Sequence, residues 1–403
     1  MKNARILALF LALALVLGCG AFASGGSGGG RYLTVNANGL TVGSASWTVD
    51  GPVPADPALT DCVIEHETEF GGVYILMTID DFNAMGFAYG DSVDVTFSNG
   101  YTLTDLPYYN GYYTGTGVPL LVAYPGYPYI KACINNGDDL WVLAGLGDGD
   151  AAAITLREAG KYADIQDARD IHYWDERERY DSDEIFANFR NVAVGDMAEG
   201  VLYRAASPAD NQHSRASYVD ALIALAGVRC IVDLADTDEK LQGYIEAEDF
   251  ASPYFLSLYE SGNVLPLALN TNYGSETNRA SIAAGLAAMA EHEGPYLVHC
   301  TEGKDRTGFI CMVLEALAGA DYDELLGDYM LTYANYYGIT PETDPAKYDT
   351  IVENVFLDLL RTMIGEDGID PAEADLAACA RGFLAACGMT DGEIDALRAR
   401  LTG

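Results

Sequence analysis

The chain has 403 residues, half of them hydrophobic, and is long enough for two or three domains with buried cores. It carries 60 acidic and 22 basic residues, which gives a formal net charge of −38. This charge opposes approach to nucleic acids and anionic membrane surfaces, so the composition argues against a nucleic-acid partner.

The segment 1–30 has the pattern of an export signal followed by a tether. Two basic residues precede an apolar stretch, 6–17, that is too short to span a bilayer comfortably. "VLGC", ending at Cys19, resembles the lipidation site of bacterial lipoproteins, whereas "AFA" fits ordinary cleavage after Ala23. The following "SGGSGGG" suits a flexible tether and favours lipidation of Cys19. We expect an extracytoplasmic protein, either anchored to the cell membrane by a lipid or secreted.

Residues 31–160 are rich in Gly, Tyr, Val and Thr, with short alternating runs. "DSVDVTFSNGYTLTDL" places such runs around the turn signal Asn99-Gly100 and predicts a hairpin. The segment 31–160 is therefore predicted to be an all-β domain, in which Cys62 and Cys133 could pair. No CxxC or HExxH motif occurs in the chain, so no metal or cofactor is predicted.

The next segment, 161–180, is densely charged and is predicted to be a linker. In 181–340, short β-rich runs such as "GVRCIVDLAD" and "PYLVHC" alternate with helical patterns such as "TGFICMVLEALAGA". This alternation predicts an α/β domain with a mostly parallel sheet flanked by helices. The segment 341–403 reads as three helices that complete this domain.

"HCTEGKDRTG", from His299 to Gly308, lies between an apolar strand and an apolar helix. Backbone N–H groups of such a loop converge at the positive end of the helix dipole, with Gly303 free to take a positive φ. The result is an anion site. The same field favours the thiolate of Cys300, which is the nucleophilic form of the side chain.

Each polar residue of the loop has an expected role. Arg306 can present two parallel N–H donors to a phosphate, which a lysine cannot. Thr307 can donate its hydroxyl to the thiolate when the cysteine is the leaving group, and His299 can hold the loop through backbone hydrogen bonds. The remaining loop residues are expected to bind the phosphate: Thr301, Glu302, Gly303 and Lys304.

These residues fit the cysteine-phosphatase signature HCxxGxxRT, and "GKDRTG" resembles the bacterial tyrosine phosphatase family. "NFRNVAVGDMAEGVLYRAASP" (188–208) and "GVRCIVDLADTDEK" also resemble that family's opening and one of its strands. The resemblance covers about residues 180 to 340. It implies phosphomonoester hydrolysis through a phosphocysteine intermediate, with phosphotyrosine as the default substrate.

Two positions depart from the family pattern: Ala235 stands where an arginine is usual, and Ala205 where a serine is usual. Both departures affect the expected substrate contacts. Arg190 and Arg204 lie in the resembling segment, and two interpretations of them stay open. They contact the substrate, or they form structural ion pairs.

The general acid is expected to be Asp305. Between Asp249 and Cys300 the chain has no aspartate, so the usual source of this group is missing. In the resembling family the loop aspartate is the proposed acid. The alternatives are that Asp305 only braces the loop and that Glu260 or Glu276 supplies the proton.

The sequence thus predicts an exported protein tyrosine phosphatase. Because Lys304 adds a second positive charge beside Arg306, a phosphoinositide or inositol-phosphate phosphatase is the alternative within the same chemistry. A catalytically inactive, phosphate-recognising binding module is the alternative from another class.

Overall fold

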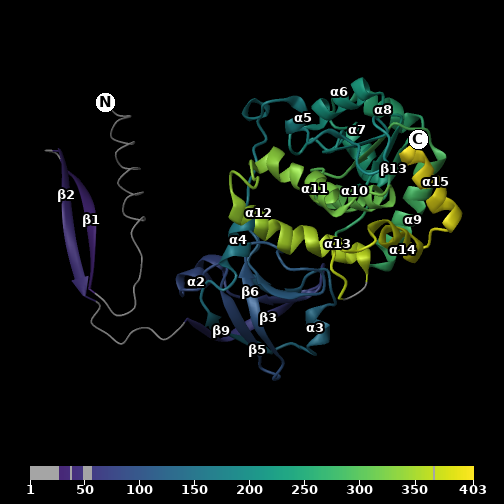
Figure 1. The fold of residues 1–403 in the computed structure, drawn as a ribbon. Coiled ribbons are helices and arrows are strands. Elements are labelled where there is room, and N and C mark those ends of the chain that lie inside the picture. Colours follow the sequence, from purple (N-terminus) through teal and green to yellow (C-terminus); the bar gives the residue numbers. More distant parts are fainter. Residues whose placement is uncertain (1–26, 37–38, 49–56, 366–367) are drawn as a thin grey trace. The chain divides into compact units, whose positions relative to one another are not determined.

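The computed structural model describes residues 27–36, 39–48, 57–365 and 368–403. They belong to two compact units, Met1–Ala58 and Leu59–Gly403 (Figure 1). In the first unit, β1 (Ser27–Asn36) and β2 (Gly39–Thr48) form an antiparallel hairpin, so β1 begins within the segment predicted as a tether. The predicted export signal and Cys19 lie outside the described residues.

Seven strands close into a barrel in the order β3-β4-β8-β7-β6-β5-β9. Their bounds are β3 (Ala58–Glu67), β4 (Gly72–Ile75), β5 (Ser92–Phe97), β6 (Thr102–Tyr109), β7 (Pro119–Val122), β8 (Ile130–Ile134) and β9 (Ala151–Glu158). Antiparallel pairing dominates, and the predicted hairpin is confirmed: β5 and β6 pair across a turn in which Gly100 has φ +92°. Alternate residues of β5, such as Val93, Val95 and Phe97, fill the barrel core.

Two details of the all-β prediction for 31–160 were wrong. The barrel starts at residue 58, and it includes two short helices, α2 (Ile79–Ala84) and α3 (Leu140–Leu143). Each helix is opened by a side-chain cap, from Thr78 and Asp139 respectively, a local device that strand periodicity does not reveal.

The suggested disulfide in this region was also wrong. Cys62 and Cys133 are both free. Cys62 lies on β3 and Cys133 on β8, and β4 pairs with both of these strands and separates them.

The second part of the larger unit is built on a five-stranded sheet of order β10-β11-β14-β12-β13. The strands are β10 (Arg190–Val192), β11 (Leu202–Ala205), β12 (Cys230–Asp233), β13 (Val264–Pro266) and β14 (Tyr296–His299). All pairs are parallel except the edge pair β10–β11. Val232 and Val298 face one hydrophobic core while Ile231 and Leu297 face another, so helices cover both faces of the sheet.

The helices follow the predicted alternation, and they lie on both sides of the sheet (Figure 1). One core includes residues of α6 (Ala216–Ala226), α7 (Asp238–Ile245) and α8 (Pro253–Glu260). The other includes residues of α9 (Glu276–Glu291), α10 (Asp305–Leu317), α11 (Tyr322–Tyr337), α12 (Pro345–Ile351), α13 (Leu357–Ile364), α14 (Leu376–Cys387) and α15 (Asp391–Thr402).

The predicted linker is not a featureless connection. It contains α4 (Ala163–Arg169) and a 3-10 turn (Arg177–Arg179), and a short helix, α5 (Asp183–Phe186), follows. A π-helical turn (Val352–Phe356) joins α12 to α13. Within the described ranges, no helix is both long and apolar enough to cross a membrane.

Candidate active site

The phosphate-site motif lies at a strand–loop–helix junction, as its flanking apolar runs predict. β14 ends at His299, and α10 begins at Asp305 with Lys304 as its N-cap residue. β14 is the middle strand of a sheet whose central pairs are parallel, so the loop emerges at the edge where the carboxyl ends of these strands meet. Cys300 is the first residue of the loop and is only 2% exposed.

Neighbouring segments bind the backbone carbonyls of the loop from outside. The Thr301 carbonyl accepts from the Ser207 N–H at 3.1 Å, and the Glu302 carbonyl accepts from the Tyr336 hydroxyl at 2.8 Å. Because the N–H and C=O of a peptide point in opposite directions, outward carbonyls turn the N–H groups toward the space beside Cys300. This is the geometry of an anion site.

Position 303 imposes two requirements that only glycine, among the amino acids, can meet. Its φ is +69°, and a Cβ at this position would lie 2.3 Å from the Ala205 carbonyl oxygen. Its own carbonyl accepts from Arg204 Nη2 at 3.0 Å and from Asn188 Nδ2 at 3.2 Å. The loop therefore packs closely against β11.

Arg306 is held at two points in the first turn of α10. Its Nη1 donates to the Leu269 carbonyl at 3.3 Å, and its Nη2 donates to Thr301 Oγ1 at 3.2 Å. Burial works against the charge of Arg306, but the nearby Cys300 and Tyr273 favour it, and the net effect raises the pKa of Arg306. The guanidinium stays charged beside the thiol.

Lys304 lies among groups that balance its charge. Its Nζ is 3.4 Å from Glu302 Oε2, 3.7 Å from Asp305 Oδ2 and 3.3 Å from the Tyr337 hydroxyl. Burial lowers the pKa of Lys304, but Asp305, Tyr337 and Glu302 raise it well above its ordinary value. Asp305 has a side chain that is 46% exposed, so its carboxylate is open to a leaving group or to solvent.

His299 and Thr307 are both completely buried. Burial lowers the pKa of His299 to about 4, so the ring is neutral near pH 7. His299 Nδ1 lies 3.3 Å from the Cys300 carbonyl, which a neutral ring with a proton on Nδ1 can hold. The Thr307 hydroxyl has no hydrogen-bond partner among the described residues, so it is available to the thiolate.

The structure places Arg190 and Arg204 in a buried ion-pair network with Asp328 of α11. Arg190 Nε donates to Asp328 Oδ1 at 2.7 Å, and Arg204 pairs with the other carboxylate oxygen. Burial raises the pKa of Asp328, but the two arginines lower it by more than burial raises it. The pKa of Asp328 therefore lies well below its usual range. Of the two interpretations of these arginines, the structure contains the ion pairs, and substrate contact stays a prediction.

Sequence reasoning missed Asp233, which lies at the end of β12 opposite His299 in the parallel register. Its Oδ1 accepts from the N–H groups of Ala235 and Asp236 at 2.8 and 3.2 Å, whereas its Oδ2 is buried without a partner among the described residues. Burial raises the pKa of Asp233 to about 6, and Arg306 opposes this rise. The available signal was an aspartate ending a buried parallel strand, "CIVD", beside the strand of the motif.

The role of the linker as part of the site was also missed. The ring of Tyr173 is tilted against the rings of Tyr336 and Tyr337 of α11, with centroids 5.1 and 5.8 Å away respectively. Tyr336 binds the Glu302 carbonyl, and Tyr337 binds Lys304. Aromatic side chains therefore stand beside the loop, and a lone tyrosine in a charged run gave no hint of this.

The two glutamates considered as alternative acids lie at other places in the fold: Glu260 ends α8, and Glu276 begins α9. No hydrogen bond or ion pair joins either of them to the loop within the described structure. Among all the residues that the structure describes, no cluster of three or more His, Cys, Asp or Glu side chains could hold a metal ion.

Comparison with known proteins decides the family. The model of the tyrosine phosphatase family matches residues 184–403, which is more than half of the chain. The chain belongs to this family. A relative named tyrosine-protein phosphatase, from Nostoc commune, is 28% identical over 143 residues, which cover 32% of this chain and 48% of the relative. The chain thus spans about half the length of the curated relative it matches, and the resemblance inferred from "HCTEGKDRTG" is confirmed.

The family match begins at residue 184, after the barrel and the linker. It includes the loop from His299 to Gly308, the Asp328 network and α15 at the end of the chain. The barrel therefore lies outside the part of the chain that matches the family.

Proposed function

We propose that this protein is a phosphoric monoester hydrolase that removes phosphate from phosphotyrosine in proteins through a phosphocysteine intermediate. The observation that supports this most strongly is the loop from Cys300 to Arg306. A buried thiol and a guanidinium lie at its two ends, and its carbonyls are bound from outside. Membership of the tyrosine phosphatase family supports the same reaction.

In the first step, the substrate phosphate occupies the loop, and its oxygens accept from the loop N–H groups and from Arg306. The Cys300 thiolate attacks phosphorus, so an S–P bond forms while the P–O bond to the tyrosine breaks. The phenolate takes a proton from an acid as it leaves. In the second step water attacks phosphorus and gives a proton to the carboxylate that served as the acid, which restores that acid. The S–P bond breaks, inorganic phosphate is released, and Thr307 donates a hydrogen bond to the thiolate that leaves.

Asp305 is the proposed acid because its carboxylate is the exposed one in the loop. Asp233 is the second candidate, because its raised pKa keeps it partly protonated near pH 6 and its Oδ2 has no partner among the described residues. Asp233 is itself completely buried, so it could reach a substrate only at the bottom of the site.

Inositol phosphates are the second substrate class. The specific observation in favour of them is the ammonium of Lys304 in the loop from Cys300 to Arg306, which is called the phosphate loop from here on. Against them, that charge is already balanced by Glu302 and Asp305. Lys304→Met should reduce activity on polyphosphorylated inositides more than on phosphotyrosine peptides if the ammonium binds a second phosphate. Equal losses would assign Lys304 to support of the loop.

Export is proposed on the sequence pattern alone, with Cys19 as the residue that would carry a lipid. Metabolic labelling with a fatty-acid analogue tests it. Label on the wild type and none on Cys19→Ala supports a membrane-anchored lipoprotein. An unlabelled protein recovered from the medium supports cleavage after Ala23 instead.

The central test is Cys300→Ser, with Cys62→Ser in the barrel as a matched control. A hydroxyl has no anionic form near neutral pH, so turnover of p-nitrophenyl phosphate and of phosphopeptides should be lost while phosphopeptide binding survives. Activity above about 1% of wild type would contradict the covalent mechanism. Binding without turnover in the wild type would favour the inactive binding module.

A further inference from the structure

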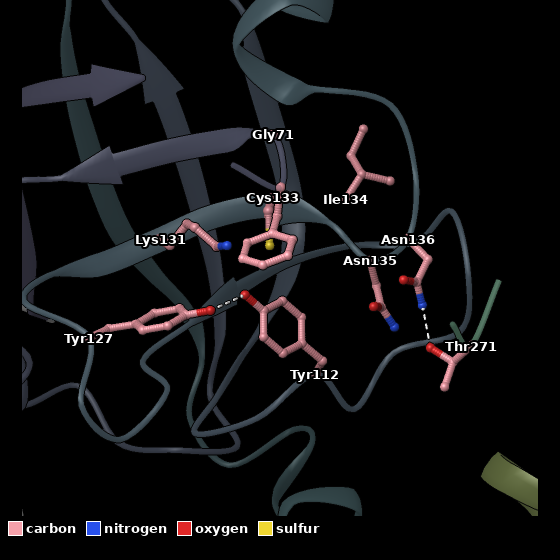
Figure 2. A pocket seen from close by; sticks show the side chains of 10 residues that line it. Gly71, Tyr112, Tyr127, Lys131, Cys133, Ile134, Asn135, Asn136 and Thr271 are labelled. Carbon is pink, nitrogen blue, oxygen red and sulfur yellow. Dashed lines mark hydrogen bonds between the residues drawn. The ribbon is translucent and has the colours of Figure 1, made fainter. Parts of the chain in front are cut away.

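A pocket of about 350 Å³ lies at the surface of the barrel. Nine of its ten lining residues precede the part of the chain that matches the family, and the tenth, Thr271, lies within that part. Figure 2 shows its side chains, which come from the turn after β3, the loops on both sides of β7, strand β8 with the turn after it, and the segment that follows β13. They are Phe70, Gly71, Tyr112, Tyr127, Lys131, Cys133, Ile134, Asn135, Asn136 and Thr271. The volume is at the lower end of the range for ligand sites and suits one side chain.

A buried ion pair organises the walls of this pocket. Lys131 is 1% exposed, and its Nζ donates to Glu67 Oε2 at 3.2 Å. The same ammonium lies 5.2 to 5.9 Å from the ring centroids of Tyr127, Tyr112 and Phe70. The other carboxylate oxygen of Glu67 accepts from the backbone N–H of Phe70 at 3.1 Å.

Such a pair is not explained by stability, because removing two charges from water costs about as much as their attraction returns. Here the ammonium of Lys131 contacts three aromatic walls of the pocket and Glu67, the residue that places Phe70. The Tyr112 and Tyr127 hydroxyls are also bonded to each other at 2.9 Å, as Figure 2 shows. The rings are therefore held in place before any ligand arrives.

Phe70 is the exposed wall. Its side chain is 73% exposed although its ring lies over the Lys131 ammonium. An aromatic ring that enters beside it can bury apolar area and can pack edge-to-face with the tyrosine rings. An acidic ligand fits less well, because Glu67 already balances Lys131 and the chain as a whole carries a formal charge of −38.

The pocket adjoins the phosphate loop through the segment after β13. Asn136 Nδ2 donates to Thr271 Oγ1 at 2.8 Å, and Asn272 Nδ2 donates back to the Asn136 carbonyl at 2.8 Å. Two residues before Thr271, the Leu269 carbonyl accepts from Arg306. One short segment therefore forms a wall of the pocket and also holds the arginine of the phosphate loop.

Lys304 of the phosphate loop also acts on the barrel electrostatically. Tyr113 follows the pocket residue Tyr112 in the chain. Burial raises the pKa of the Tyr113 hydroxyl, and Lys304 lies near enough to oppose that rise. The contact that joins the pocket to the phosphate loop is therefore the segment from Leu269 to Asn272.

We propose that this pocket holds an aromatic side chain of the protein substrate, a few residues along the chain from the phosphotyrosine bound by the Cys300 loop. The proposal rests on the proposed function and adds a substrate preference to it. An extended chain advances about 3.3 Å per residue, so a neighbour two to four residues away reaches roughly 7 to 13 Å from the phosphotyrosine. The barrel then takes part in choosing the substrate.

The experiment uses the full chain and a set of phosphotyrosine peptides. One peptide has alanine at all four positions on each side, and the others carry a single phenylalanine at one of those positions. We expect the wild type to prefer phenylalanine at one or two positions by about 3- to 10-fold in kcat/KM, the size expected of one aromatic contact. Phe70→Ala should reduce that preference to less than twofold.

Leu225→Ala is the matched control, because Leu225 is 85% exposed on α6 and lines no part of the pocket. It should keep the preference. A wild type with no preference for phenylalanine at any position would overturn the proposal, as would Phe70→Ala with the preference intact. If no peptide is hydrolysed, the proposed function fails instead, and the same ratios measured as binding affinities still test the pocket.

Discussion

Two buried ion-pair centres in this protein support two different kinds of binding surface. In the part of the chain that matches the tyrosine phosphatase family, Asp328 lies between Arg190 and Arg204, and Arg204 also donates to the Gly303 carbonyl of the phosphate loop. In the barrel, Lys131 pairs with Glu67 and lies among three aromatic rings.

The two centres differ in what they hold. A guanidinium has several donors in a rigid plane, so Arg204 can bind Asp328 and a backbone carbonyl at once. That suits a phosphate site, which depends on the direction of backbone N–H groups. An ammonium is compact and attracts ring faces from several sides, which suits an aromatic pocket. The ligand that each surface is proposed to take therefore corresponds to the cation that supports it.

The largest expected effect concerns proton transfer to the leaving group. Of the two surfaces, only the phosphate loop requires it. Asp305→Asn should reduce hydrolysis of phosphotyrosine peptides about 10²–10⁴-fold, because the phenolate needs a proton as it leaves. It should affect p-nitrophenyl phosphate much less, since p-nitrophenolate leaves well without one. Steady-state rates for both substrates measure this.

Asp233→Asn is the matched variant for that experiment. If Asp233 is the acid, its variant shows the loss that depends on the leaving group, and Asp305→Asn reduces both rates alike. In that case Asp305 braces Lys304 and the loop.

The next effect compares the stability of the two centres. Asp328→Asn removes the carboxylate that both buried arginines bind, and arginine cannot lose its proton, so we expect a loss of about 3–5 kcal/mol. Glu67→Gln should cost less, about 1–3 kcal/mol, because a lysine can deprotonate when its partner is removed. Unfolding in urea measures both, and equal losses would mean that the two centres are equivalent.

The pH dependence of stability should show two opposed contributions beside the phosphate loop. The lowered pKa of His299 gives stability that is present above pH 6.5 and is lost as the pH falls through about 4. The raised pKa of Asp233 gives stability that is present below pH 3.8 and is lost as the pH rises through about 6. Each contribution is about 3 kcal/mol, so in the wild type they largely cancel between pH 4 and 6.

Single variants should separate these contributions. Relative to the wild type, Asp233→Asn should lose stability as the pH falls from 6.5 to 4, whereas His299→Gln should gain it over the same range. Thermal unfolding at several pH values measures the slopes. Parallel curves for the two variants would contradict the assignment.

The smallest expected effect is at the link between the two surfaces. Asn136→Ala removes the bond to Thr271 and should cost about 1 kcal/mol of stability or less. It should also lower kcat/KM for p-nitrophenyl phosphate about two- to fivefold, if a looser Leu269 carbonyl positions Arg306 less well. Asn354→Ala, which removes a bond to the Thr350 carbonyl within one helical segment, should leave that rate unchanged. A normal rate in Asn136→Ala would show that the barrel and the phosphate loop act separately.

The sequence by itself determined the local part of the site. The apolar runs on either side of "HCTEGKDRTG" specify a strand and a helix, so the motif between them must form the loop that connects the two. Gly303 was expected to take a positive φ, and it does. These features could be predicted because strand, loop and helix depend on residues that are adjacent in the chain.

Only the tertiary structure decided which distant residues support these local features. Asp328 meets Arg190 and Arg204 across 138 and 124 residues of chain, and no periodicity in the sequence marks that meeting. Asp233 gains its neighbours only when β12 and β14 pair, and Thr271 joins the barrel pocket only because the barrel packs against the segment after β13. A contact between remote residues depends on the packing of whole elements, whereas a local sequence pattern records only which elements form.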